Sequence, residues 1–295
     1  MTPTSTWRAA LVMAAVVTLC GACGRRDSSE GEWRAAGRRV GHERPTLAAE
    51  LCPPSEHPLT VTTSSGDRTA IVRVPDGAAA PLPAVVAVHG FAARADEFVE
   101  MSGLTDEADA AGVALIAPQG AGDPTGWEVL GDFEADDVFV SEVLDRLVAS
   151  GCIDGDRMAM GGHSAGSAFA AFYGCAHPDR FAALVLNAGL PPPLCNHGTP
   201  NLVITHGVED PVVPFDGGDQ AVGGSTVELG SIPGSAAAWA AQAGCGEPAA
   251  PMIDGATTWT RWSNCDGRTS VVLAAIDGWG HVWPGPGSDA GLDDG

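Results

Sequence analysis

The chain has 295 residues, of which 45% are hydrophobic and 18% charged, so it is not intrinsically disordered and can build one large domain with a sizeable core. Its net charge is −22 and all 15 basic residues are arginines, so its surface repels nucleic acid and anionic lipid. A neutral or weakly charged substrate fits this surface better, although acidity also serves solubility alone.

The N-terminus indicates export. Arg8 precedes an apolar run, residues 9–19, that is too short to span a bilayer as a mature helix. The segment Cys20-Gly-Ala-Cys23 follows and resembles a bacterial lipoprotein processing site, with Cys23 as the lipidated residue. Ordinary cleavage after Ala22 is the alternative.

These signals divide the chain into three parts. We expect a signal peptide of the lipoprotein type at residues 1–22, a flexible Arg- and Gly-rich tether at 23–50 and one folded domain at 51–295. The protein is therefore predicted to be extracellular or in the bacterial cell envelope, and to meet a membrane only through its lipid anchor.

Apolar segments alternate with helical patterns along the domain. Two β-rich segments come first, separated by a turn, and predict an antiparallel hairpin. The later strands are apolar without alternation, which is typical of strands covered on both faces. The pattern predicts an α/β fold with a mostly parallel, doubly wound sheet of about eight strands and helices on both faces. The expected strands are 59–63, 69–74, 84–88, 113–118, 157–161, 183–187, 201–205 and 270–276, and the expected helices are 94–111, 135–148, 168–173 and 235–243.

The strand at 157–161 leads into Gly162-His-Ser164-Ala-Gly166. This is the pattern of a nucleophile elbow, in which a strand turns sharply into a helix and presents a serine at the top of the sheet. The pattern alone is weak in a glycine-rich chain, so the assignment of Ser164 as nucleophile depends on a base and an acid further along.

Two later loops supply them. Asp210 follows the strand at 201–205 and is the candidate acid, with Glu209 as the second choice. His281 lies in a glycine-rich loop after the last strand and is the only histidine beyond Asp210. The order Ser, Asp, His is that of the nucleophile-elbow hydrolases. His281 would take the Ser164 proton, Asp210 would orient and stabilise the imidazole, and water would then hydrolyse the acyl-enzyme without any cofactor.

The oxyanion of such a reaction needs N–H donors. We expect them from Ala165, at the start of the helix, and from Phe91, in the loop after the strand at 84–88. His89 is expected to be structural, tying loops together, and His163 to pack without a catalytic role.

Cysteine usage agrees with export. Six cysteines remain beyond Cys23, and three disulfides are plausible in an oxidising compartment. Zinc is disfavoured because no Cys-x-x-Cys pair remains in the mature chain, and no pair of His or Asp ligands has the spacing of a metal site. Spacing alone does not settle the pairing. The preferred pairs are Cys245 with Cys265, then Cys152 with Cys175, and by elimination Cys52 with Cys195.

Several segments together resemble the polyhydroxybutyrate depolymerase and feruloyl esterase-like group of α/β-hydrolases. They are His89-Gly90, the elbow, His206-Gly-Val-Glu-Asp210-Pro-Val-Val-Pro214 and Gly280-His281-Val-Trp283-Pro-Gly285. The resemblance implies the α/β-hydrolase fold and a secreted or lipid-anchored serine carboxylesterase. Its substrates would be feruloyl or acetyl esters of plant polysaccharide, or short hydroxyalkanoate esters such as polyhydroxybutyrate.

Two features depart from that group. Phe91 stands where the group often has a small residue or cysteine, which would narrow the acyl pocket. The chain also ends 14 residues after His281 on a polar tail, so the usual closing helix is expected to be missing.

Trp127, Trp279 and Trp283 are candidates for substrate contact, with core packing as the equal alternative. A non-catalytic binding protein of the same fold is the alternative function, because fold does not fix function. The acyl specificity and the oligomeric state stay open.

Overall fold

A computed structural model describes residues 52–285, apart from 65, 130–132, 190, 192–194, 196–197, 223–224 and 268. The expected signal peptide, the tether with Cys23 and the tail after Gly285 lie outside the described residues, so the predictions made for them stay predictions. No helix in the described part of the chain is both long and apolar enough to cross a bilayer.

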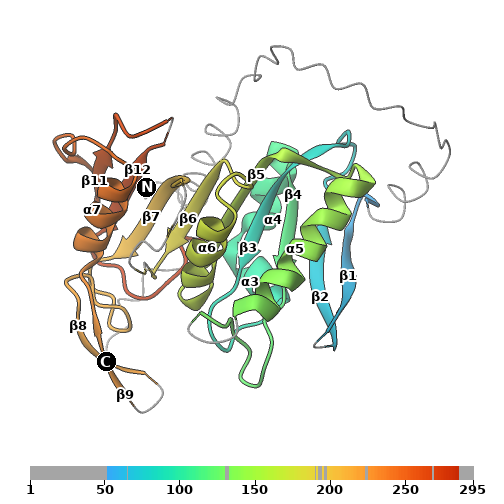
Figure 1. Ribbon diagram of the computed structural model, residues 1–295, viewed down its shortest axis with the longest axis horizontal. Helices are drawn as coiled ribbons and strands as arrows, with labels where there is room; N and C mark the ends of the chain where they lie inside the picture. The colour runs from blue at the N-terminus through green and yellow to red at the C-terminus, as the bar shows by residue number, and fades with distance from the viewer. Residues whose placement is uncertain are drawn as a thin grey trace, which may run out of the picture.

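One mixed sheet of ten strands organises the described residues, in the order β1-β2-β4-β3-β5-β6-β7-β12-β11-β10 (Figure 1). Its central strands, from β4 to β12, are parallel, and antiparallel strands extend it at both edges. The strands are β1 (Glu56–Thr63), β2 (Gly66–Arg73), β3 (Leu82–Val88), β4 (Ala114–Pro118), β5 (Ile153–His163), β6 (Ala183–Asn187), β7 (Asn201–Gly207), β10 (Met252–Asp254), β11 (Thr257–Trp262) and β12 (Val271–Ile276). A separate hairpin consists of β8 (Gly218–Val222) and β9 (Ser225–Leu229).

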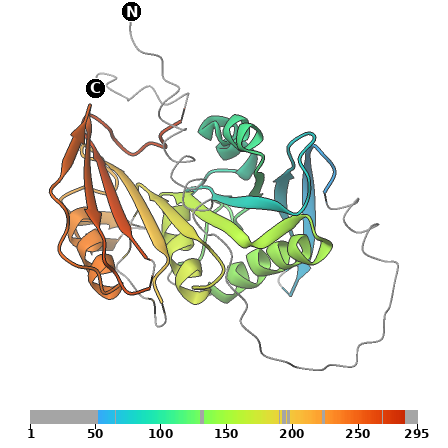
Figure 2. The ribbon, with the colours of Figure 1, turned by 90° about the horizontal axis from the view of Figure 1, so that it is seen from above.

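Helices cover both faces of the sheet, as Figure 2 shows from above. On one face lie α3 (Ala95–Ser102) and α4 (Leu104–Ala111). On the other lie α5 (Phe133–Ser150), α6 (Ala165–Ala176) and α7 (Ile232–Gln242). Each face has its own apolar cluster, because the uninterrupted apolar strands β4 and β6 present side chains in both directions. The α/β-hydrolase fold and the doubly wound sheet are thus confirmed.

The eight expected strands are present, but the sheet has ten strands, two more than the sequence predicts. The segment after α7, expected to be a loop, contains the hairpin of β10 and β11, which adds two strands beside β12. The three residues of β10 are all exposed, so they carry no alternating apolar pattern from which a strand could be predicted.

Two helix predictions also need correction. The helix expected over 94–111 is broken at Gly103, which adopts a left-handed φ of 69° and ends α3 just before α4 begins. In α5 helical spacing predicts an apolar face of Val138, Val143, Leu144 and Leu147. The last three are buried together with Phe139 and Val140, whereas Val138 is 46% exposed.

All six cysteines form disulfides, but only Cys245–Cys265 has the expected pairing. Cys52 pairs with Cys152, and Cys175 with Cys195. β1 packs against α5, and Cys152 lies two residues after the end of that helix, which brings it within reach of Cys52, four residues before β1.

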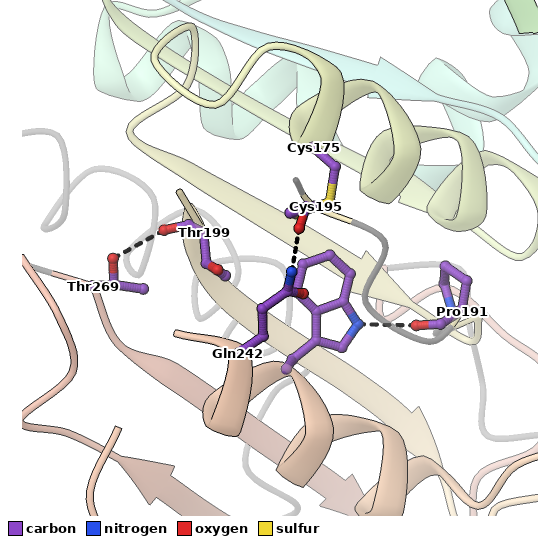
Figure 3. The surroundings of a disulfide bond; sticks show 7 residues. Cys175, Pro191, Cys195, Thr199, Gln242 and Thr269 are labelled. Atoms are coloured by element: carbon purple, nitrogen blue, oxygen red, sulfur yellow. Dashed lines mark hydrogen bonds between the residues drawn. A yellow bond between two sulfur atoms is a disulfide. The ribbon is translucent and has the colours of Figure 1, made fainter. Parts of the chain in front are cut away.

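The second correction has its reason in the positions of Pro191 and Cys195, which follow β6 in the chain and lie between α6 and α7 (Figure 3). There the Pro191 carbonyl accepts a hydrogen bond from the Trp239 indole at 2.9 Å, and the Cys195 carbonyl accepts one from Gln242. Cys195 therefore lies against the end of α6, where Cys175 is its neighbour.

Candidate active site

Three loops meet at the carboxyl edge of the parallel strands, where open α/β sheets place their sites. Ser164 links β5 to α6, Asp210 follows β7, and His281 follows β12. These strands are near neighbours in the order β5-β6-β7-β12, so residues 117 positions apart in the chain come into contact.

The turn at Ser164 is a strained one. Ser164 has φ 55° and ψ −120°, a conformation that side-chain-bearing residues rarely adopt, and α6 starts at the next residue. The flanking glycines are required by close packing. A Cβ at Gly162 would collide with the Gly166 carbonyl, and one at Gly166 with the carbonyls of Val88 and His89. The first turn of α6 therefore lies directly on the end of β3.

A continuous chain of hydrogen bonds joins the three side chains. His281 Nε2 lies 2.8 Å from Ser164 Oγ, and His281 Nδ1 lies 2.8 Å from Asp210 Oδ2. Since a carboxylate only accepts, Nδ1 carries a proton and Nε2 is left to accept the serine proton. The structure thus brings together Ser164, Asp210 and His281, the residues selected from the sequence.

Asp210 is almost wholly buried and is held by its own loop. Its Oδ1 accepts hydrogen bonds from the Val212 and Val213 N–H groups, each at 2.8 Å. Burial raises the pKa of this carboxyl, but the hydrogen bonds from His281, Val213 and Val212 outweigh burial and leave the pKa below its usual range. Asp210 therefore stays charged at neutral pH.

Glu209, the second choice for the acid, has a different place. Its carboxylate accepts the Gly278 N–H at 2.6 Å, and its own N–H donates to the Trp279 carbonyl at 3.0 Å. It fastens the loop that carries His281 and does not contact the imidazole.

The Phe91 and Ala165 N–H groups, the two donors expected from the sequence, form no hydrogen bond within the described part of the chain. Gly90 lies beside Ser164, since a Cβ there would be 3.5 Å from the Ser164 Cβ. The Phe91 side chain is 64% exposed.

His89 anchors the loop before Phe91. Its Nδ1–H donates to the Gly90 carbonyl at 2.8 Å, and its Nε2 accepts the Gly120 N–H at 2.9 Å. The ring thus ties two loops together, which is the structural role expected for it. Trp127 fixes the same point, because its Nε1–H donates to the His89 carbonyl at 2.9 Å.

The three candidate tryptophans lie in the interior, which favours core packing over substrate contact. Trp127 is 7% exposed and stacks on Phe169, Trp283 is 2% exposed and meets Phe98 edge to face, and Trp279 is 4% exposed. An indole buried to this degree offers no platform to a sugar or aromatic ring, so these three assignments are corrected.

His163 and Asn187 extend the site beside Ser164, whose N–H donates to the Asn187 carbonyl at 2.9 Å. His163 Nδ1 lies 2.6 Å from Asn187 Oδ1, and Asn187 Nδ2 donates to Thr205 Oγ1 at 2.9 Å. The His163 ring centroid is 4.9 Å from that of His281. Burial lowers the pKa of His163 to about 4, so the ring is neutral at working pH. Asn187 was missed in the sequence, where its one signal is a polar residue ending a buried strand.

His206 was also missed, although it opens one of the segments that carry the resemblance. It is buried behind Asp210, with Nε2 3.3 Å from Asp210 Oδ2.

No group of three or more potential metal-binding His, Cys, Asp or Glu side chains occurs among the residues described.

The sequence of this chain is similar to known esterases. Residues 69–193 match the family model described as Esterase PHB depolymerase. A curated relative, the "putative esterase NocK" of Nocardia uniformis subsp. tsuyamanensis, is 31% identical over 229 residues. Over residues 69–193 the chain is thus similar to the PHB depolymerase esterases. The match with the Nocardia protein covers 69% of this chain and 66% of the relative, just under two thirds of the relative's length.

Solved structures share the fold of this chain. An acetyl xylan esterase from Aspergillus awamori superposes with a TM-score of 0.61 at 14% identity, covering 77% of this chain and 95% of that one. An S-formylglutathione hydrolase from Agrobacterium tumefaciens gives a TM-score of 0.53 at 14% identity, with 77% and 88% covered.

Proposed function

We propose that this chain is a serine carboxylesterase that hydrolyses acyl esters through an acyl-enzyme. The observation that carries the proposal is the unbroken chain Ser164 Oγ, His281, Asp210, with 2.8 Å at both links. Ser164 attacks the ester carbonyl, His281 takes its proton and returns it to the leaving alcohol, and Asp210 stabilises the imidazolium. Water then attacks the acyl-enzyme with His281 again as base.

The oxyanion of each tetrahedral intermediate binds to the N–H groups of Phe91 and Ala165. Their lack of other partners in the described part of the chain supports this assignment. One such donor is typically worth about 100- to 1000-fold in rate. The substrates we propose are feruloyl, acetyl or short hydroxyalkanoate esters, including polymeric ones.

The proposed location is extracellular or in the cell envelope, with Cys23 as the lipidated residue. Three disulfides support an oxidising compartment.

The test is hydrolysis of p-nitrophenyl acetate, p-nitrophenyl butyrate and methyl ferulate by the purified chain and by Ser164→Ala. We expect turnover that falls to background in the variant, and labelling by a fluorophosphonate only where Ser164 is present. Ser263→Ala is the control, because this exposed serine follows β11 at the opposite edge of the sheet and should retain full activity. A folded wild-type chain that neither turns over these esters nor takes the label would refute the proposal.

A further inference from the structure

A fully buried histidine, His206, lies directly behind Asp210. It is the penultimate residue of β7, and its backbone is held beside Ala275 of β12. The next residue, Gly207, packs so tightly against the carbonyls of Trp279 and Gly280 that a side chain there would collide with them. The end of β7 is thus fixed between the loop of Asp210 and the loop of His281.

The contacts of His206 define its protonation. Nε2 lies 2.8 Å from the Val213 carbonyl oxygen and 3.3 Å from Asp210 Oδ2. Both atoms only accept hydrogen bonds, so Nε2 carries a proton. Nδ1 is buried and has no hydrogen-bond partner among the described residues, so a proton there would be buried without an acceptor. His206 is therefore a neutral imidazole in one tautomer.

This N–H completes the surroundings of the Asp210 carboxylate. Oδ1 accepts from Val212 and Val213, and Oδ2 accepts from His281 at 2.8 Å and faces His206 Nε2–H at 3.3 Å. Val213 closes a ring, since its N–H binds Asp210 while its C=O binds His206. Hydrogen-bond donors at both Oδ1 and Oδ2 thereby fix the orientation of the carboxylate plane.

We propose that His206 is a positioning residue of this site, whose Nε2–H holds the 210–213 turn and the Asp210 carboxylate so that Oδ2 stays in line with His281 Nδ1. The inference rests on the proposed esterase function. His206 does not touch the substrate and takes no part in proton transfer; it acts through Asp210.

A purely structural histidine would need only the Val213 carbonyl, and its loss would lower stability without changing the Asp210–His281 hydrogen bond. A positioning histidine affects that hydrogen bond and with it kcat, because small displacements of catalytic groups are costly. Loss of a positioning His206 therefore lowers kcat and changes the Asp210–His281 hydrogen bond, whereas loss of a purely structural His206 lowers only the stability.

The first arm compares His206→Leu with His206→Gln. Leu fills a similar volume without a donor, whereas the Gln amide can place an N–H near the position of Nε2. We expect Leu to lower kcat by about 10- to 100-fold with KM changed less than about 2-fold, and Gln to recover most of the rate. Should the Leu variant not fold, His206→Asn replaces it, since its shorter amide does not reach Val213 or Asp210.

The second arm is NMR of the 15N-labelled protein without substrate. In the wild type, His206 should show a protonated Nε2 and a bare Nδ1, and the His281 Nδ1–H proton should appear far downfield. That proton signal should persist in the Gln variant and move upfield or vanish in the Leu or Asn variant. A wild-type His206 protonated on Nδ1 would overturn the proposal.

A folded Leu variant with wild-type kcat and an unchanged His281 signal would overturn it equally. These results are separable from failure of the proposed function. If the wild type hydrolyses no ester, the esterase assignment fails, while the NMR arm still decides whether His206 positions Asp210.

Discussion

His163 shows how much a single side chain beside the nucleophile is constrained. It donates to Asn187 on one side and faces the His281 ring on the other. A positive charge on His163 would oppose the imidazolium that forms on His281 during turnover. Its low pKa, caused by burial, thus serves the proposed chemistry as well as the packing.

This burial has a consequence for stability. The pKa of His163 is about 4 in the folded chain and 6.5 in an ordinary histidine, so between these values the unfolded chain binds a proton that the folded chain does not. The unfolding free energy is therefore not reduced by His163 above pH 6.5, and it falls as the pH drops from 6.5 towards 4. The full shift corresponds to about 3 kcal/mol.

His163→Phe keeps a ring against His281 and removes the titration. We expect the loss of unfolding free energy between about pH 7 and pH 4.5 to be smaller in this variant by roughly 2 kcal/mol, measured by urea denaturation. Carboxylates titrate in both proteins and cancel in the comparison. Equal losses in the two would mean that the folded chain accommodates a charged His163.

At this scale the sequence predicted three residues that the structure brings into hydrogen-bonding contact. Ser164, Asp210 and His281 follow from chain order and from loops after buried strands. The tryptophans and His206 could not be assigned in the same way, because the direction of a side chain at a loop or strand end depends on packing by distant segments. Trp127, for instance, is turned inwards by Phe169 and by the His89 carbonyl.

At the scale of elements, the junction between β3 and α6 has no room to adjust. Gly166→Ala places a Cβ against the Val88 and His89 carbonyls, so α6 must shift and carry the Ala165 N–H with it. We expect a loss of about 1–3 kcal/mol in stability and of roughly 100-fold in kcat.

Gly155→Ala is the matched control, because it lies in β5 and a Cβ there meets only Val148 methyl groups at 3.4 and 3.5 Å. It should change kcat less than about 2-fold, as expected for a substitution that moves no catalytic group. The idea fails if Gly166→Ala retains wild-type activity in ester hydrolysis assays.

Elements with a strong pattern were predicted well, and weak ones were not. The eight long or fully apolar strands and the four helical regions were recognised from periodicity. The hairpin β8–β9 and the strand β10 were missed because such short strands have neither an apolar run nor alternation. The strand β11 was missed because Thr and Arg interrupt its two tryptophans, so it has no apolar run. Gly103 inside an apparently continuous helix gives a similar ambiguity, since glycine can be tolerated in a helix or end it.

At the scale of the whole molecule, the disulfides restrict very different lengths of chain. Cys52–Cys152 spans 100 residues, whereas Cys245–Cys265 spans 20 and closes around a local hairpin. In the chain-entropy model the long loop is worth about 4.7 kcal/mol and the short one roughly 3 kcal/mol.

Replacing both cysteines of a pair by serine tests this difference. The Cys52/Cys152 double variant should lose about 1–1.5 kcal/mol more unfolding free energy than the Cys245/Cys265 double variant, by chemical denaturation at neutral pH. Esterase activity at 25 °C should be retained in both, because neither bridge contacts the site. A larger loss from the 20-residue bridge would show that local packing outweighs loop length.

The Cys52–Cys152 bridge also fixes where the N-terminal end of the described chain leaves the body. Cys152 lies at the amino end of β5, and Ser164 follows its carboxyl end, so the whole length of an 11-residue strand separates the attachment from the nucleophile. A support joined through residues before Cys52 would therefore hold the molecule on the side opposite Ser164. Immobilised that way on a bead or electrode, the protein would turn Ser164 outwards, towards an insoluble polymer film as readily as towards a dissolved ester.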